Sequence, residues 1–248
     1  MNSVRNDVSR LEVSSDLEAL SRRVADWMLE LAFAKDGIFA VCLSGGSTPR
    51  RLYECLAEAP YRDRFPWPRT HWFWGDERFV SHDSVRSNFR MANEALLSHV
   101  PIPPSNIHPI PTSGSDPAKA ASDYERTLKA FYGADRLEQA RPLFDVNLLG
   151  LGTNGHTASL FPGSPVLAER DRWVAAVVGE TPEERITLTY PVLESSRNAA
   201  FLVAGKEKQA IFARLREADE TLPAARVRPT GTLWMFADAA AAGATSKT

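Results

Sequence analysis

The sequence predicts an α/β protein with three layers (α/β/α), in which helices cover both faces of a mostly parallel, Rossmann-like sheet. Apolar runs that suit buried strands alternate with amphipathic segments, which is typical of βαβ units. Small residues and glycines follow two of these runs, as they do at the carboxyl ends of parallel strands. No repeat or change of composition divides the 248 residues, so we expect a single domain over residues 1–248.

The first half of the predicted fold begins with a helix from Asp16 to Ala34, whose apolar residues recur at helical spacing. Ser15 and Glu18 form a capping-box pattern at its start. Residues 38–43 are apolar without alternation and predict a fully buried strand. A second helix is predicted to open near Arg50, because the proline before it suits a first helical turn.

The rest of the chain continues the alternation. The predicted strands cover residues 71–74, 144–149, 173–178, 186–190, 199–204 and 233–236. The predicted helices cover residues 87–98, 116–132 and 206–218. Five prolines between residues 101 and 111 indicate a rigid connection rather than a flexible linker. We expect frayed ends at about residues 1–13 and 240–248.

Composition excludes several classes of partner. The formal net charge is -2, with acids and bases mixed along the chain, which argues against a nucleic-acid-binding surface. The N-terminus lacks the apolar core of a signal peptide, and no apolar run is long enough to cross a bilayer, so we expect no membrane association. Cys42 and Cys55 lack redox-motif spacing and indicate reduced thiols in a cytoplasmic protein. The oligomeric state stays open, with a monomer favoured.

The most informative segment is the glycine-rich loop from Gly150 to Gly163, which follows an apolar run and presents His156. Glycines let the backbone adopt left-handed angles and approach a ligand closely. Histidine titrates near neutrality and suits proton transfer. By itself the pattern also fits a tight turn with a surface histidine, so the other segments decide between the two.

A second loop resembles a phosphate cradle. It joins a buried strand to a helix, where backbone N–H groups and the helix dipole favour an anion. Its residues are Ser44, Gly45, Gly46, Ser47 and Thr48. The loop lacks the Walker A lysine and the third glycine of the dinucleotide fingerprint, so a nucleotide cofactor is not expected. The alternative is an ordinary turn whose helix is capped by Ser47 or Thr48.

Charged residues supply the remaining candidates. Asp76, Glu77 and Arg78 end the second strand; either acid is a candidate to orient a base, and Arg78 to hold an anionic oxygen in a two-pronged contact. Arg185 begins a strand and Lys208 lies in the first turn of a helix, and both are candidate phosphate ligands. Each of these residues taken alone also fits a solvated surface charge.

The sequence offers no metal site. The five histidines show neither a His-x-x-x-His pair nor a cysteine/histidine cluster. A Gly-x-Ser-x-Gly elbow is absent, which argues against a serine hydrolase. We therefore expect neither a metal nor an organic cofactor.

In their order along the chain, these segments resemble the family of glucosamine-6-phosphate isomerases/deaminases and 6-phosphogluconolactonases. The matching residues are 43–49, 76–78, 83, 87–88, 150–163, 185–191, 205 and 208. The resemblance implies a three-layer α/β/α fold and a sugar-phosphate substrate. It also implies that the Ser44–Thr48 loop, Arg185 and Lys208 hold the phosphate, and that His156 acts on water.

Two features resemble the lactonase branch of that family. The deaminase branch has a proton-relaying glutamate where this chain has Phe161, and phenylalanine cannot relay protons. The triplet from Asp76 to Arg78 also resembles the lactonases, whereas the other branch usually has tyrosine in third place. The resemblance implies hydrolysis of 6-phospho-D-glucono-1,5-lactone to 6-phospho-D-gluconate, the second step of the oxidative pentose phosphate pathway.

One residue departs from the family pattern. Aspartate usually precedes the Gly-His pair, and this chain has Asn154. Asparagine accepts a hydrogen bond from the imidazole ring but brings no charge to it. Three interpretations stay open: Asn154 suffices, Asp76 supplies the charge across the cleft, or the chain binds a sugar phosphate without converting it.

Overall fold

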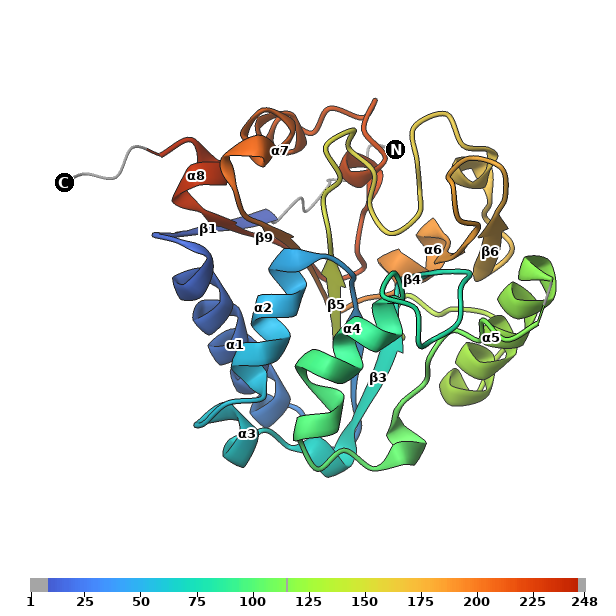
Figure 1. Ribbon diagram of the computed structural model, residues 1–248, viewed down its shortest axis with the longest axis horizontal. Coiled ribbons are helices and arrows are strands. Elements are labelled where there is room, and N and C mark those ends of the chain that lie inside the picture. The colour runs from blue at the N-terminus through green and yellow to red at the C-terminus, as the bar shows by residue number, and fades with distance from the viewer. Residues whose placement is uncertain (1–8, 115, 245–248) are drawn as a thin grey trace.

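The computed structural model describes residues 9–114 and 116–244, and its centre is a six-stranded parallel sheet (Figure 1). The strand order is β1-β9-β8-β5-β2-β3. These strands are β1 (Ser9–Ser14), β2 (Phe39–Leu43), β3 (Thr70–Trp74), β5 (Val146–Leu149), β8 (Asn198–Val203) and β9 (Thr232–Asp238). The predicted mostly parallel sheet is confirmed.

Helices cover both faces of this sheet. They are α1 (Leu17–Ala34), α2 (Ser47–Leu56), α3 (Tyr61–Arg64), α4 (Asn88–Ala95), α5 (Pro117–Tyr132), α6 (Tyr190–Glu194), α7 (Gln209–Arg216) and α8 (Ala239–Ala242). Neighbouring residues of β3 point to opposite faces. Trp74 contacts Phe89 of α4 at a centroid distance of 5.5 Å, and Phe73 contacts Phe131 of α5 at 4.8 Å. The three-layer arrangement follows from these contacts.

A second, antiparallel sheet departs from the predicted arrangement. Its order is β4-β7-β6, formed by β4 (Asp76–Arg78), β7 (Arg185–Leu188) and β6 (Val174–Val177). The sequence predicts strands near β7 and β6 but does not separate them from the main sheet. It places residues 76–78 only at the end of the second strand. Backbone pairing alone defines β4, which is too short and too polar to show an apolar pattern.

The N-terminal prediction is wrong in two respects. Residues 9–13 are not frayed but belong to β1, which pairs with β9 from Ser9 opposite Leu233 onward. The strand is largely exposed, so its sequence carries no apolar run. The helix that follows is capped by Asp16, whose Oδ1 accepts from the Ala19 N–H at 2.8 Å, and not by the expected Ser15–Glu18 box.

At the other end of the chain, the fraying expected from residue 240 is wrong for residues 240–242, which are helical. Helix α8 continues to Ala242 and ends at Gly243, whose φ of 69° suits a left-handed cap. Residues 245–248 lie outside the described residues.

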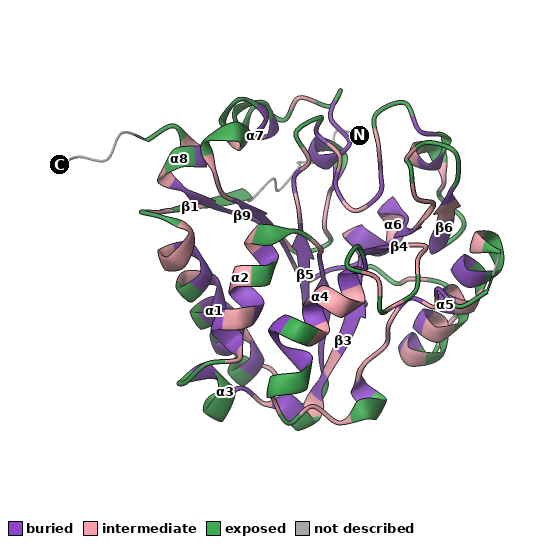
Figure 2. Cartoon of the chain, in the orientation of Figure 1, coloured by how far each residue is buried: buried purple, intermediate pink, exposed green. Residues whose placement is uncertain are grey.

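The buried apolar side chains form one continuous cluster. In Figure 2 the buried residues, coloured purple, lie along the strands of the sheet and on parts of the helices around it. All five residues of β2 are buried, because helices and neighbouring strands cover both of its faces. Cys42 and Cys55 are buried free thiols, and burial raises the pKa of Cys55 to about 11. Both cysteines therefore act as small core residues.

A histidine pair lies between β3 and the loop that precedes α5. His71 Nδ1 and His108 Nε2 are 2.9 Å apart, and the rings stack with 9° between their planes. Burial lowers the pKa of both side chains, to about 4 for His108, where His71 adds to the effect. The folded protein therefore holds this pair uncharged at neutral pH.

The pair predicts a loss of stability in acid. Because the pKa of His108 is lower in the folded than in the unfolded chain, unfolding takes up protons, and stability falls as the pH drops from about 6.5 to about 4. We expect His108→Phe to remove about 1 kcal/mol of the loss in unfolding free energy between pH 7 and pH 4.5, allowing for partial solvent screening. Urea unfolding at pH 7 and at pH 4.5 measures this loss for both proteins. Exposed His99→Gln is the control, and an equal loss in wild type and His108→Phe would contradict the account.

Candidate active site

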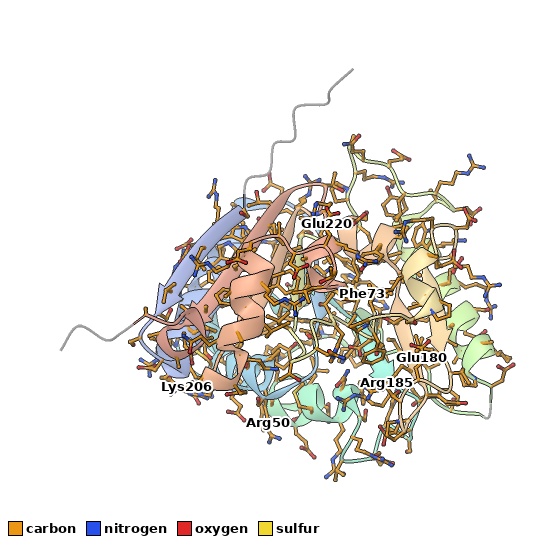
Figure 3. All side chains as sticks on the ribbon, turned by 90° about the horizontal axis from the view of Figure 1, so that it is seen from above. Arg50, Phe73, Glu180, Arg185, Lys206 and Glu220 are labelled. Atoms are coloured by element: carbon orange, nitrogen blue, oxygen red, sulfur yellow. The ribbon has the colours of Figure 1, made fainter. Side chains whose placement is uncertain are left out.

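The predicted chemical residues gather around one cavity of about 350 Å³. It lies at the carboxyl ends of β2, β3 and β5, where open α/β sheets bind ligands. It is lined by Ser44, Gly45, Gly46, Asp76, Arg78, Asn88, Gly150, Leu151, Gly152, Thr153, His156, Ala158, Phe161, Arg185 and Lys208. Figure 3 shows the molecule from above, with Arg185 labelled. Of the candidate site residues, Ser47, Thr48, Glu77 and Asn154 lie outside this lining.

The turn after β2 ends in an uncapped helix. Helix α2 begins at Ser47 rather than near Arg50, and the preceding Gly46, with a φ of 105°, supplies no side chain to cap it. The predicted alternative, a side-chain cap by Ser47 or Thr48, is therefore wrong. The N–H groups of these two residues have no hydrogen-bond partner in the described parts of the chain. They remain free to bind an anion.

Asn88 packs directly against this turn. A Cβ on Gly45 would lie 2.1 Å from Asn88 Oδ1, so only glycine fits there. The Asn88 amide donates to the Asp76 carbonyl oxygen at 2.9 Å. Asn88, which the sequence singles out only as one of the residues that resemble the family, therefore lines the cavity.

The hydrogen bonds of His156 determine its tautomer. Asn154 Oδ1 accepts from the His156 backbone N–H at 3.2 Å and lies 2.6 Å from His156 Nδ1. Because the backbone N–H can only donate, the amide atom that faces both nitrogens is the oxygen. Nδ1 therefore carries the proton. Nε2, which has no partner among the described residues, keeps its lone pair.

Backbone geometry explains two glycines of this loop. A Cβ on Gly152 would lie 2.0 Å from His156 Nδ1, inside the volume of the ring. Gly155 has a φ of 84° and packs against Leu222, where a Cβ would lie 2.6 Å from a side-chain carbon. The Gly152 N–H also donates to the His156 carbonyl oxygen at 2.8 Å. The two glycines make room for the imidazole and fix the turn that carries it.

The surroundings of His156 favour its neutral form. Burial is the main cause that lowers its pKa, and Lys208, Arg185 and Arg78 lower it further. Asp76 acts in the opposite direction. His156 is therefore an uncharged base at neutral pH.

Arg78 and Arg185 lie directly opposite each other in the pairing of β4 with β7. The Nε atom of each is buried without a hydrogen-bond partner in the described residues. Burial lowers the pKa of Arg185, and Arg78 adds to the effect. Lys208 extends to the same cavity and donates from Nζ to the Leu151 carbonyl oxygen at 2.9 Å. Three cations with unused donors make this part of the cavity suited to an anion.

Glu77 has a different position from its neighbours. It is 1% exposed, and its carboxylate accepts from the backbone N–H groups of Asn88 and Phe89, both at 2.7 Å. Burial raises its pKa, and these hydrogen bonds oppose the shift. Glu77 therefore holds the start of α4, and of the two acids proposed to orient a base only Asp76 lines the cavity.

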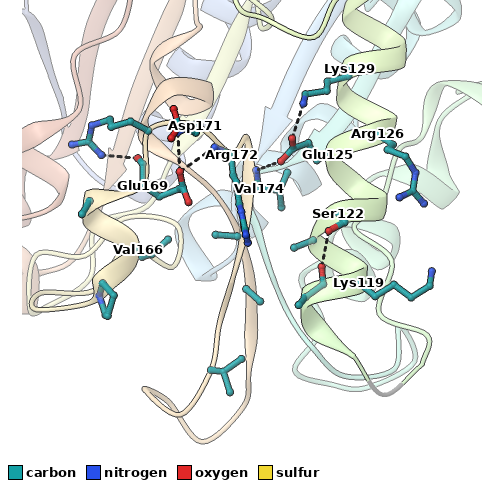
Figure 4. A pocket seen from close by; sticks show the side chains of 18 of the residues that line it. Lys119, Ser122, Glu125, Arg126, Lys129, Val166, Glu169, Asp171, Arg172 and Val174 are labelled. Carbon is teal, nitrogen blue, oxygen red and sulfur yellow. Dashed lines mark hydrogen bonds and ion pairs between the residues drawn. The ribbon is translucent and has the colours of Figure 1, made fainter.

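A larger groove of about 1230 Å³ lies between α5 and the segment that leads into β6 (Figure 4). Two acids of this groove have partners within the protein. Glu125 accepts from the backbone of Trp173 at 2.9 Å and pairs with Lys129 at 2.7 Å, and Glu169 accepts from the backbone of Asp171 at 2.8 Å. The groove contains none of the candidate residues. We therefore assign the chemistry to the smaller cavity.

Two further properties of the described residues bear on function. Within residues 9–114 and 116–244, no three histidine, cysteine, aspartate or glutamate side chains form a group able to hold a metal ion. The helices in this part of the chain also fall short of the length and hydropathy that a membrane span requires.

Comparison with known proteins connects this geometry to a family. The sequence profile described as glucosamine-6-phosphate isomerases/6-phosphogluconolactonase matches residues 15–235. The chain belongs to this family. The family fold agrees with the resemblance predicted from the motifs.

Relatives in the glucosamine-6-phosphate isomerase/6-phosphogluconolactonase family match over most of their length. The chain is 44% identical over 210 residues to 6-phosphogluconolactonase from Synechocystis sp., covering 83% of this chain and 84% of the relative. It is 41% identical over 237 residues to 6-phosphogluconolactonase from Nostoc sp., covering 93% and 96%. The crystal structure of 6-phosphogluconolactonase from Thermotoga maritima matches with a TM-score of 0.76 and 35% identity, covering 93% and 99%.

Proposed function

We propose that the chain hydrolyses 6-phospho-D-glucono-1,5-lactone to 6-phospho-D-gluconate, the second step of the oxidative pentose phosphate pathway, with His156 as the base. The observation that carries this proposal is a neutral imidazole, with Nε2 free, beside three cations in one cavity. The relatives named 6-phosphogluconolactonase support the choice of substrate.

The phosphate binds first and places the ring. Arg185 and Lys208 hold its oxygens, together with the Ser44–Thr48 turn. Ser44, Gly45 and Gly46 of this turn line the cavity, and Ser47 and Thr48 follow them with N–H groups that have no partner in the described residues. This binding energy comes from a part of the substrate that does not react. It positions the lactone carbonyl next to His156 and offsets the entropy that is lost when the reacting groups are aligned.

Hydrolysis then proceeds without a covalent intermediate on the protein. His156 Nε2 takes a proton from water while the water oxygen bonds to the lactone carbonyl carbon. Arg78, or the backbone N–H groups of the glycine-rich loop, stabilises the oxyanion that forms. The ring C–O bond breaks, and its oxygen takes the proton from the His156 imidazolium. The acid product ionises and releases one proton to solvent.

Phe161 favours hydrolysis over the isomerase or deaminase chemistry of the same family. Its ring lies 4.8 Å from that of His156 and lines the cavity. An isomerase needs a group there that moves a proton to or from the substrate's C2. We expect acid release from freshly made 6-phosphogluconolactone and no deuterium incorporation at C2 of glucosamine-6-phosphate in D₂O. Exchange at C2 without lactone hydrolysis would favour the isomerase instead.

Gly152→Ala tests how the loop makes room for the base. The new Cβ would occupy the position of His156 Nδ1, so the ring must leave its hydrogen bond to Asn154. We expect kcat to fall about 100-fold, within the range that general base catalysis supplies, while the thermal midpoint changes little. Gly75→Ala, whose Cβ would meet its nearest neighbours at an ordinary 3.6 Å and whose backbone is not left-handed, is the control. Wild-type turnover in Gly152→Ala would show that the ring position is unimportant.

We further infer that the protein works in the cytoplasm as one domain. Its buried apolar residues form one continuous cluster, and its two cysteines are free and buried.

A further inference from the structure

The turn that follows His156 is held in an uncommon backbone conformation. It runs from Thr157 to Leu160 and is closed by the Leu160 N–H, which donates to the Thr157 carbonyl oxygen at 2.9 Å. Ala158 within it has a φ of 47°, a left-handed angle that costs free energy for a residue with a side chain. Such strain persists where surrounding contacts fix the backbone, and here it directs Ser159 into the interior, where it is 0% exposed.

Ser159 binds both members of a cross-strand pair. Asp76 of β4 lies opposite Thr187 of β7 in the antiparallel sheet. The Ser159 hydroxyl donates to Asp76 Oδ2 at 2.7 Å, and its backbone N–H donates to Thr187 Oγ1 at 3.2 Å. All three residues are buried. Asp76 is thereby joined to the loop that carries the base.

Asp76 has a particular importance in this chain. Among the residues that line the cavity together with His156, Asp76 is the carboxylate, and Lys208, Arg185 and Arg78 are the cations. The residue bound to His156 Nδ1 is the uncharged Asn154. When His156 takes a proton, the carboxylate that stabilises the imidazolium is therefore the one that Ser159 holds.

We propose that Ser159 is a positioning residue that fixes the Asp76 carboxylate toward His156, and that this contact takes the place of a carboxylate bound directly to the imidazole. The inference rests on the proposed function of His156 as the base. Ser159 itself does not line the substrate cavity, which is lined by Ala158 and Phe161 on either side of it in the sequence.

The first test compares Ser159→Ala with Ser196→Ala. Ser196 is equally buried and donates one hydrogen bond, to the Leu193 carbonyl oxygen at 2.8 Å, away from the cavity. For Ser159→Ala we expect kcat to fall about tenfold with KM within about twofold of wild type. The acidic limb of the pH–rate profile should move to lower pH by about 0.5 units, because a loosened Asp76 raises the pKa of His156 less. An equal fall in Ser196→Ala, or no fall in Ser159→Ala, would overturn the inference.

A second test separates this inference from the proposed function. In the Asp76→Asn background, Ser159→Ala should cause no further fall in kcat, and an additive loss would contradict a shared role. The NMR titration of the His156 ring reports its pKa without turnover. If wild type does not hydrolyse the lactone, the proposed function is wrong, and the titration still decides whether Ser159 acts on His156. Ser159→Cys, which keeps the volume with a weaker donor, gives the same readouts if the alanine variant does not fold.

Discussion

Replacing His156 with alanine is expected to remove nearly all turnover of 6-phosphogluconolactone and to leave the binding of 6-phosphogluconate almost unchanged. The imidazole supplies the proton acceptor for water, and general base catalysis contributes about 10²–10⁴ in rate. We therefore expect kcat to fall by about 10³. The phosphate contacts of Arg185 and Lys208 remain in this variant. Acid release gives kcat, and calorimetric titration gives the product affinity.

The control for this variant is His99→Ala. His99 is exposed, and its ring bonds to the Glu94 carbonyl oxygen at 2.8 Å, away from the cavity, so loss of the ring should leave kcat unchanged. If His156→Ala turned the lactone over at the wild-type rate, another group would have to be the base. If it lost product binding as well, His156 would belong to the binding surface instead.

Arg185→Ala is expected to raise KM about 100-fold, which is about 2.7 kcal/mol of binding, with kcat within about threefold of wild type. The phosphate does not change during the reaction, so Arg185 binds the ground state and the transition state about equally. Its buried Nε has no other partner in the described residues, so the binding of an anion satisfies it. Steady-state kinetics at saturating and at limiting substrate concentrations measure kcat and KM separately.

Arg126→Ala serves as the matched charge deletion. Arg126 is exposed on α5 and pairs with Asp123, away from the cavity, so its loss should change neither constant. Arg185→Lys should lie between wild type and Arg185→Ala, because lysine keeps the charge but not the two-pronged donor. A fall in kcat at unchanged KM would instead place Arg185 at the reacting carbonyl.

The main sheet could be predicted from the sequence because its strands are buried on both faces. Residues 38–43 show this, since β2 is apolar throughout. Strands that lack an apolar pattern were not predicted. β1 is an exposed edge strand, and β4 consists of three charged or polar residues paired through their backbones. Local side-chain signals also failed to choose between Ser15 and Asp16 as the helix cap, because both residue types accept backbone N–H groups.

Most of the residues that line the cavity could be predicted from the sequence, because glycines and charged residues mark the carboxyl ends of the strands. The sequence could not distinguish Glu77 from Asp76, since alternation along β4 decides which carboxylate faces the cavity. Nothing in the sequence pattern singles out Ser159 within the glycine-rich loop. The hydrogen bond from Ser159 to Asp76 joins residues that are 83 positions apart in the sequence. Such contacts depend on tertiary structure and leave no local pattern.

The most direct test of the central claim, that a neutral His156 activates water, is the pH dependence of lactone hydrolysis by the wild-type protein. Acid release from freshly generated 6-phosphogluconolactone would be followed from pH 4.5 to pH 7.5 and corrected for spontaneous opening. Because burial lowers the pKa of His156 below 6.5, we expect kcat/KM to hold as the pH falls to about 6.5 and to decline below it. No acceleration over the spontaneous reaction, or activity that persists to the lowest pH, would contradict the claim.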